Sequence, residues 1–200
     1  ANGGGVWITG SGTITINGGE VAGHSVTSDG AGIQASHSTL SLDGVVFAQN
    51  QAGFIGGAVS AIDTCTVTAG DCEFTGNGAV VGAAVRVNGG HAYIRHNLVA
   101  GNTASVTGAG IYVAGLVDGE IAGNTIDGND GGTGAGGMLI SNSPIDVLNN
   151  IVTGSTGDGV LVSGALSSFD YNLVWNSSGA DYNGVSPGTG AVSADPLFAD

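Results

Sequence analysis

The sequence contains no lysine and only two arginines, Arg86 and Arg95, among its 200 residues. Sixteen acidic side chains oppose them, and the net charge is −14. Proteins that bind nucleic acid neutralise phosphates with clustered basic side chains, and anionic membrane surfaces attract the same residues. The composition therefore argues against nucleic acid and anionic membranes as partners.

Long apolar runs are also missing. No stretch reaches the roughly 18 apolar residues of a membrane-spanning helix, and no basic and apolar leader opens the chain. We therefore expect no membrane insertion. The secreted or cell-surface location that we expect rests on the composition and on the resemblance described below. The chain is expected to be either a mature protein after signal removal or a piece of a longer one, and its acidic, lysine-free composition fits extracellular surroundings.

Proline and cysteine are scarce, at three and two residues, whereas glycine reaches 40. With 42% hydrophobic residues, the glycines must punctuate a folded chain rather than form a disordered Pro/Gly linker. Cys65 and Cys72 permit one disulfide in an oxidising compartment, but two buried thiols acting as small apolar fillers are equally compatible with the sequence.

A regular repeat dominates what is present. A Gly-x-(Gly/Ala)-(Ile/Val) motif, or a close variant of it, starts at each of these equally spaced glycines: Gly30, Gly56, Gly82, Gly108 and Gly134. Flanking copies start at Gly3 and Gly157, which makes seven units. Equal steps of this kind indicate a repeat architecture.

Asparagine keeps step with the glycines. The later units place an asparagine just before their last apolar pair, namely Asn97, Asn124, Asn150 and Asn172. Asparagine tolerates the left-handed conformation that a sharp corner needs, and its side chain can bind the backbone there. We therefore expect these residues to stack as a structural ladder along one edge of the protein.

Units of roughly 22–27 residues with short alternating strands and no helical periodicity are too short for propeller blades and lack the leucines of horseshoe repeats. The remaining solution is one coil of chain per unit, with each strand pairing in parallel with its equivalent in the next coil. The fold class is therefore all-β, a single-stranded parallel β-helix of about seven coils. Residues 1–176 are expected to form it.

The motifs resemble a known family. Phe47-Ala-Gln-Asn50 followed by Gly56-Gly-Ala-Val59 is similar to the paired FxxN and GGA(I/L/V) motifs of bacterial polymorphic outer-membrane protein repeats, within the right-handed parallel β-helix family. The resemblance covers about residues 3–176 and implies a right-handed coil and a secreted or cell-surface, often adhesive, solenoid. The C-terminal membrane barrel of those proteins is absent from this sequence.

The two ends of the solenoid are expected to differ. Residues 177–200 are expected to form a polar loop and a C-terminal segment, in which Leu197 and Phe198 fold back onto the last coil. No amphipathic helix precedes the first coil, so its strand edges and core are expected to be open.

Catalysis has little support in the residues. Enzymes with this fold that cleave acidic polysaccharides need cations to neutralise the uronate and a base or a close carboxylate pair. Two arginines supply little of this, and the paired-aspartate, Gly-His-Gly and Arg-x-Lys motifs of galacturonan hydrolases are absent. We therefore expect no enzymatic activity, with a polysaccharide lyase or hydrolase as the alternative.

Acidic residues suggest one metal site, although no other cofactor is expected. Ca²⁺ prefers clusters of carboxylate oxygens. Glu120 and Asp146 are one repeat length apart and should therefore be stacked neighbours. The candidate ligands are Asp118, Glu120, Asp127, Asp130 and Asp146.

Other polar residues point to no site. The four histidines, His24, His37, His91 and His96, share no metal spacing and are expected at exposed turns. Thr13-Ile-Thr15 and Thr66-Val-Thr68 suggest an ice-binding surface, but such a surface needs Thr-x-Thr in coil after coil, and these two are not expected to align.

One outward row remains as a candidate surface. If the first apolar residue of each repeat motif points inward, its successor points outward, which gives Trp7, Gln34, Ser60, Arg86, Tyr112, Leu139 and Leu161. The members singled out for contact with a ligand or partner are Trp7, Arg86, Tyr112, Leu139 and Leu161. Protein contact, carbohydrate binding and no function at all are the three interpretations of this row.

The functional hypothesis is an extracellular, non-catalytic structural or adhesive protein. Its expected partner is itself, in a filament, sheath or surface layer, or a cell-surface protein. The alternative is a polysaccharide-binding or polysaccharide-active domain of a secreted protein.

Overall fold

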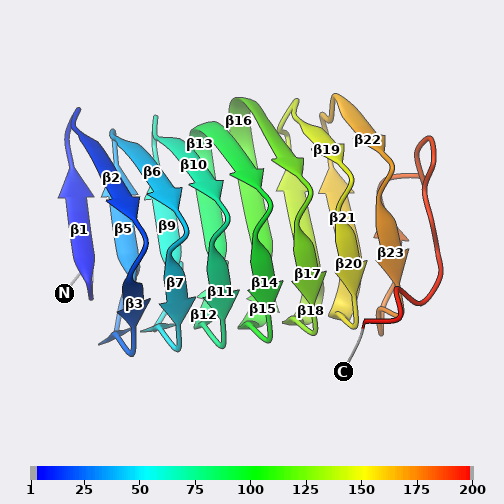
Figure 1. The fold of residues 1–200 in the computed structure, drawn as a ribbon, viewed down its shortest axis with the longest axis horizontal. Coiled ribbons are helices and arrows are strands. Elements are labelled where there is room, and N and C mark those ends of the chain that lie inside the picture. Colours follow the sequence, from blue (N-terminus) through cyan, green and yellow to red (C-terminus); the bar gives the residue numbers. More distant parts are fainter. Residues whose placement is uncertain (1–3, 199–200) are drawn as a thin grey trace.

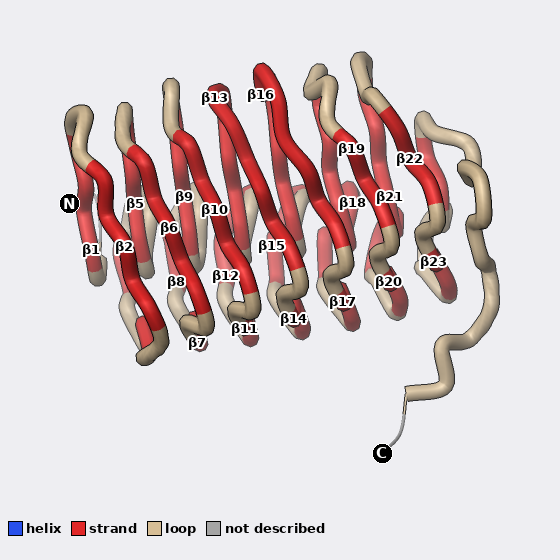
Figure 2. Tube along the Cα trace, turned by 45° about the horizontal axis from the view of Figure 1, so that its top comes forward, coloured by secondary structure: helices blue, strands red, loops and turns tan. Residues whose placement is uncertain are grey.

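Residues 4–198 are described by a computed structural model, and among them every regular element is a strand (Figure 2). The chain winds through successive coils that advance from the N-terminal end to the C-terminal end of a rod (Figure 1). All paired strands are parallel, and each pairs with its equivalents in the neighbouring coils. The prediction of an all-β parallel solenoid of about seven coils is confirmed. None of the described residues forms a helix that could cross a membrane.

The first face of the solenoid carries one strand after each of the seven repeat glycines, of which Gly3 lies outside the described residues, and one further strand at the C-terminal end. Parallel pairing runs through them from end to end. They are β1 (Val6–Thr9), β5 (Ile33–Ser36), β9 (Val59–Ile62), the start of β13 (Val85–Arg95), the start of β16 (Ile111–Ala122), the end of β18 (Asp130–Ser141), the end of β21 (Thr156–Ser163) and β24 (Tyr182–Asn183).

The second face comes next in each coil. In the middle of the rod β13 and β16 continue onto it without interruption, so one strand serves two faces. Its other strands are β2 (Thr13–Asn17), β6 (Thr39–Asp43), β10 (Thr66–Gly70), β19 (Asp146–Leu148) and β22 (Ser168–Asp170).

The third face is a separate seven-stranded sheet. It contains β3 (Glu20–Ala22), β7 (Val46–Ala48), β11 (Glu73–Thr75), β14 (Leu98–Ala100), β17 (Thr125–Asp127), β20 (Ile151–Thr153) and β23 (Leu173–Trp175). Four further strands lie between the third and first faces: β4 (Ser25–Val26), β8 (Gln51–Ala52), β12 (Gly78–Val81) and β15 (Thr103–Thr107). Loops that return to the first face follow each of them.

The core is the inside of the coils. Alternation along each strand sends every second side chain inward, and Ile111, Val113, Ile121 and Ile126 are fully buried as the pattern predicts. Equivalent residues stack along the axis. On the third face the rings of Phe47 and Phe74 lie parallel with centroids 4.9 Å apart, so the core is built of columns that run from coil to coil.

The predicted asparagine ladder is present and buried. The side-chain Nδ2 of Asn97 donates to Oδ1 of Asn124, Asn124 donates to Asn150, and Asn150 donates to Asn172, each over 2.9 Å. Each Oδ1 also accepts from the backbone N–H of the preceding asparagine. Nδ2 donates a second bond to a backbone carbonyl in the coil before it, such as that of Ile94 for Asn124.

A second buried ladder stands one corner further along each coil. Its members are Asn50, Asn77, Asn102 and Asn129, joined by the same pattern of side-chain bonds. The asparagines of the first ladder were expected to be left-handed, and this is wrong, because no asparagine of either ladder has a positive φ. The residue before each asparagine has the positive φ instead, as His96 does with a φ of 56°. The asparagine side chain is then free to point into the core and to bond to the asparagine of the next coil.

The disulfide alternative is not realised, and both cysteines are buried free thiols. Cys65 and Cys72 flank the five residues of β10, and an extended strand of that length separates its ends by more than about 13 Å. A disulfide requires Cα atoms closer than about 7 Å. Each thiol instead donates to a backbone carbonyl, of Ile62 and Gly70 respectively.

The ends of the rod differ. In the first coil the inward residues Val6, Ile14, Ile16 and Val21 are only partly buried. The last coil is covered by the segment that follows β24, which lies beside it in Figures 1 and 2. Val192 of this segment pairs with Leu173.

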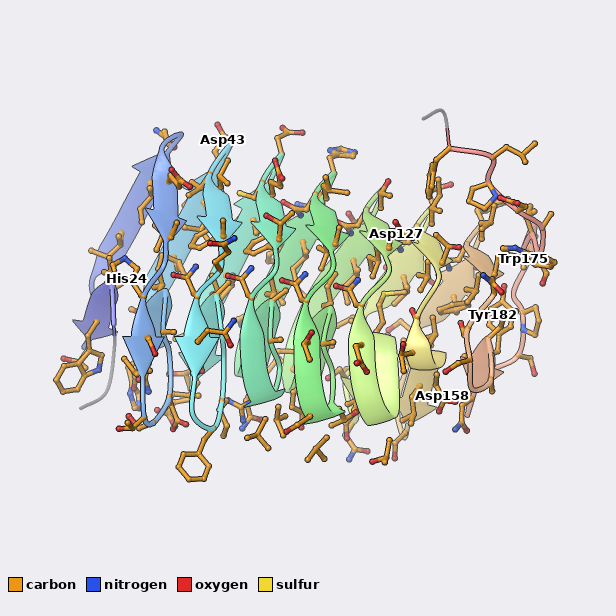
Figure 3. The ribbon with its side chains drawn as sticks, turned by 90° about the horizontal axis from the view of Figure 1, so that it is seen from below. His24, Asp43, Asp127, Asp158, Trp175 and Tyr182 are labelled. Atoms are coloured by element: carbon orange, nitrogen blue, oxygen red, sulfur yellow. The ribbon has the colours of Figure 1, made fainter. Side chains whose placement is uncertain are left out.

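The expected packing of Leu197 and Phe198 onto the last coil is wrong. Leu197 is 81% exposed and Phe198 is 48% exposed. Tyr182 and Val185 pack against the core in their place, because β24 first continues the first face by one more strand. Tyr182, Trp175 and Asp158 mark this end of the rod in Figure 3, with His24 at the opposite end.

Candidate functional site

The outward row of the first face is aligned as predicted. Trp7 pairs in register with Gln34, Gln34 with Ser60, Ser60 with Arg86, and Arg86 with Tyr112. The row then continues through Leu139 and Leu161. We call these seven residues the outer stripe. Its members differ in exposure, from 61% for Trp7 to 1% for Ser60.

The repeat glycines explain why part of the outer stripe is buried. Gly56 and Gly82 have φ near +70°, and a Cβ on Gly82 would lie 2.7 Å from Cβ of Arg86, four residues ahead. The loop before each strand therefore curls back over the side chain that follows. A side chain on the loop would collide there, and the left-handed backbone also favours glycine. The glycine loop of each motif thus covers the stripe side chain that follows it.

Three neighbouring members of the stripe carry buried polar atoms without partners in residues 4–198. They are Oε1 of Gln34, Oγ of Ser60 and Nε of Arg86. Buried polar groups normally find a hydrogen-bond partner, so this group stands apart from the fully bonded asparagine ladders.

Arg86 is the most unusual of the three. The residue is 8% exposed, and within the described chain its side chain makes neither a hydrogen bond nor an ion pair. Its guanidinium carbon lies 5.5 Å from the centroid of the Tyr112 ring. Burial lowers the pKa of Arg86, while Tyr112 and Asp29 act in the opposite direction. The Arg86 guanidinium is therefore a cation without a bonded acid. In the next coils the outer stripe continues with the half-buried side chains of Tyr112, Leu139 and Leu161.

A second group of polar side chains lies on the outside of the second face. The Tyr93 hydroxyl donates to Asp118 over 3.0 Å, and Nε of Arg95 donates to Glu120. The Arg95 guanidinium also lies 5.1 Å from the Tyr93 ring centroid. The hydrogen bond to Asp118 is the main cause that raises the pKa of Tyr93. We call these four residues the polar cluster.

The sequence pattern did not indicate Tyr93 or Arg95 as site residues. Tyr93 is separated from Asp118 by the same interval as Arg95 from Glu120, and this interval is close to the repeat length. These two equal spacings were the available signal.

The five acidic residues suggested as calcium ligands do not come together. Asp118, Glu120 and Asp146 lie on the second face, and Glu120 and Asp146 are register neighbours as predicted. Asp127 lies on β17 of the third face, where Figure 3 labels it, and Asp130 opens β18. Residues 4–198 contain no group of three metal-binding side chains. Of the five, Glu120 and Asp146 are register neighbours, and Oδ1 of Asp146 accepts from Ser168. Calcium binding by these residues stays a prediction.

The expectation that the threonine motifs do not align is wrong. Thr13 pairs with Thr39 and Thr39 with Thr66, while Thr15 pairs with Ser41 and Ser41 with Thr68. The intervening Thr39-Leu-Ser41 completes two hydroxyl rows over three coils. The rows end where His91 and Tyr93 take the same positions.

Histidines occupy corners in part. His37 and His96 have positive φ at turns, whereas His91 lies within β13. His37 also lies 3.5 Å from Asp63.

The stacked parallel coils, inward columns and asparagine ladders define the class of β-solenoid proteins. The model of the right-handed β-helix region matches residues 4–191, and the chain belongs to this family. No curated protein and no solved structure matches it.

Proposed function

We propose that this chain is an extracellular, non-catalytic solenoid module of structural or adhesive type, which contacts a protein partner through the outer stripe. The observation that carries the proposal is the buried guanidinium of Arg86, which lacks a bonded acid in residues 4–198 and begins a row of half-buried apolar side chains. The acidic, lysine-free composition supports the location.

The chemistry of the stripe suits a protein surface. Arginine and tyrosine are enriched where proteins meet, whereas lysine and glutamate are depleted there. Tyr112, Leu139 and Leu161 follow Arg86 at successive coil spacings, about 4.8 Å each. A partner with one carboxylate and several apolar side chains would satisfy this row.

The test is binding of the labelled whole chain to cells of the producing organism, measured by flow cytometry. We expect Tyr112→Ala and Leu139→Ser to lower binding at least tenfold. Val117→Ser is the matched control, because Val117 is an exposed apolar residue outside the stripe. Equal binding by all variants would contradict the proposal.

The polar cluster favours polysaccharide binding as a second candidate. A half-buried ring at Tyr93 beside Arg95 and two carboxylates offers stacking and hydrogen bonds to a sugar chain. A glycan array tests it, with loss of signal expected in Tyr93→Ala and retention in Tyr112→Ala. Release of unsaturated or reducing sugars from a uronate polymer would instead establish the polysaccharide-active alternative.

A further inference from the structure

The C-terminal segment presents an apolar pair to solvent. Leu197 is 81% exposed, the highest value among the exposed large apolar residues of the described chain, and Phe198 beside it is 48% exposed. Asp195 stands two residues before Leu197 and accepts a hydrogen bond from its backbone N–H. A carboxylate and two apolar side chains are therefore held close together on one short segment.

The outer stripe offers the complementary chemistry. Arg86 supplies a guanidinium without a bonded acid in residues 4–198, and a guanidinium desolvated in this way favours a carboxylate partner. Tyr112, Leu139 and Leu161 continue from it in strict register and keep part of their surface exposed.

The lengths of the two surfaces also agree. Three coil steps separate Arg86 from Leu161, about 14 Å along the axis. Residues 195 to 198 would span up to about 10 Å if extended. The turn that joins Asp195 to Leu197, with a φ of 50° at Leu197, would therefore open on binding. With the carboxylate at Arg86, the apolar pair reaches the side chains of Tyr112 and Leu139.

We propose that the outer stripe of one copy binds residues 195–198 of a second copy. Asp195 pairs with Arg86, and Leu197 and Phe198 cover Tyr112 and Leu139. This inference rests on the proposed function of the stripe as a protein contact and names its occupant. Because the two surfaces are different parts of the chain, the contact is heterologous and extends into an open chain of copies unless it closes as a ring.

Sedimentation velocity of the whole chain over a wide concentration range tests the proposal. We expect the wild type to associate with rising concentration, and Leu197→Ser/Phe198→Ser to weaken association at least tenfold. This double variant changes only exposed residues, so its fold should be intact. Val117→Ser is the matched control, because Val117 is 68% exposed and apolar but lies outside both surfaces.

Charge reversal tests the pairing itself. Arg86→Glu and Asp195→Lys should each lower self-association. Mixing the two variants should restore association into chains of alternating copies, because each tail then meets a stripe of opposite charge. Circular dichroism checks that Arg86→Glu, a buried substitution, remains folded. If it does not, the tail variants alone decide the question.

Two results would overturn the inference. One is a wild type that stays monomeric at every concentration, and the other is a Leu197→Ser/Phe198→Ser variant that associates like the wild type. If either occurs while Tyr112→Ala still abolishes binding to cells, the proposed function stands and only this choice of occupant fails.

Discussion

The side-chain amide of Asn97 donates to the side-chain carbonyl of Asn124 in the next coil, 2.9 Å away, and both groups are buried. The same carbonyl accepts the backbone N–H of Asn97. A single side-chain oxygen of Asn124 thus accepts two hydrogen bonds inside the core. Removing it leaves two buried donors without a partner, which costs more than the loss of one ordinary bond.

Asn124→Ala is therefore expected to destabilise the protein by about 3 kcal/mol. Urea denaturation followed by circular dichroism measures the change in free energy of unfolding. Asn88→Ala is the control, because Asn88 is exposed on β13, and it should change stability by less than about 0.5 kcal/mol. Similar losses in both variants would show that burial of the ladder does not matter.

Gly82→Ala tests the close approach of the glycine loop to Arg86 in the outer stripe. Gly82 and Gly101 both have positive φ, but a Cβ on Gly82 would collide with Arg86, whereas one on Gly101 meets nothing within 4 Å. Gly101→Ala should cost about 1 kcal/mol from backbone strain alone. We expect Gly82→Ala to cost at least about 1 kcal/mol more, because the steric clash adds to the strain. Thermal melts of the two variants compare these costs, and equal shifts would contradict the close approach.

Cys65 and Cys72 should resist thiol reagents in the native protein. Both are buried, and burial is the main cause that raises the pKa of Cys72, so its thiolate, the reactive form, is scarce at neutral pH. Ellman's reagent should detect no thiol until denaturant is added, and then two. Absence of thiols after denaturation would indicate that a disulfide had formed.

Tyr93 is expected to ionise at higher pH than an ordinary tyrosine, because its hydroxyl donates to Asp118. A folded-state pKa above the unfolded value adds stability that is present below about pH 10 and is lost as the pH rises through the folded pKa. The tyrosinate absorbance of wild type minus Tyr93→Phe isolates this group. Asp118→Asn should lower its pKa, and an unchanged curve would contradict the bond.

The repeat made the fold predictable. Equal steps between the repeat glycines fix which residues are neighbours in adjacent coils, so the parallel pairing, the stacking of Asn97 on Asn124 and the order of the outer stripe all follow from spacing. Handedness followed from the resemblance to a known family.

Spacing did not predict what loops and corners do. The burial of Ser60 depends on how the loop at Gly56 curls back, which the period does not specify. The alignment of Thr13 with Thr39 was missed because serine at position 41 interrupts the motif, and because the step from Thr39 to Thr66 is slightly longer than the regular repeat. Leu197 was expected to pack because it is apolar, but the last coil was already covered by Tyr182 and Val185.

The half-covered first coil has a consequence for how the rod comes apart. Each coil contacts only its neighbours, so local opening free energies are set by nearest-neighbour contacts. The coil that contains Ile14 and Ile16 has partly exposed core residues, and neither asparagine ladder has a member within it. The rate of amide hydrogen exchange should therefore fall along the axis, from fastest in β1 to β3 to slowest around β13 and β16. The rod would then unfold locally from its N-terminal end, coil by coil.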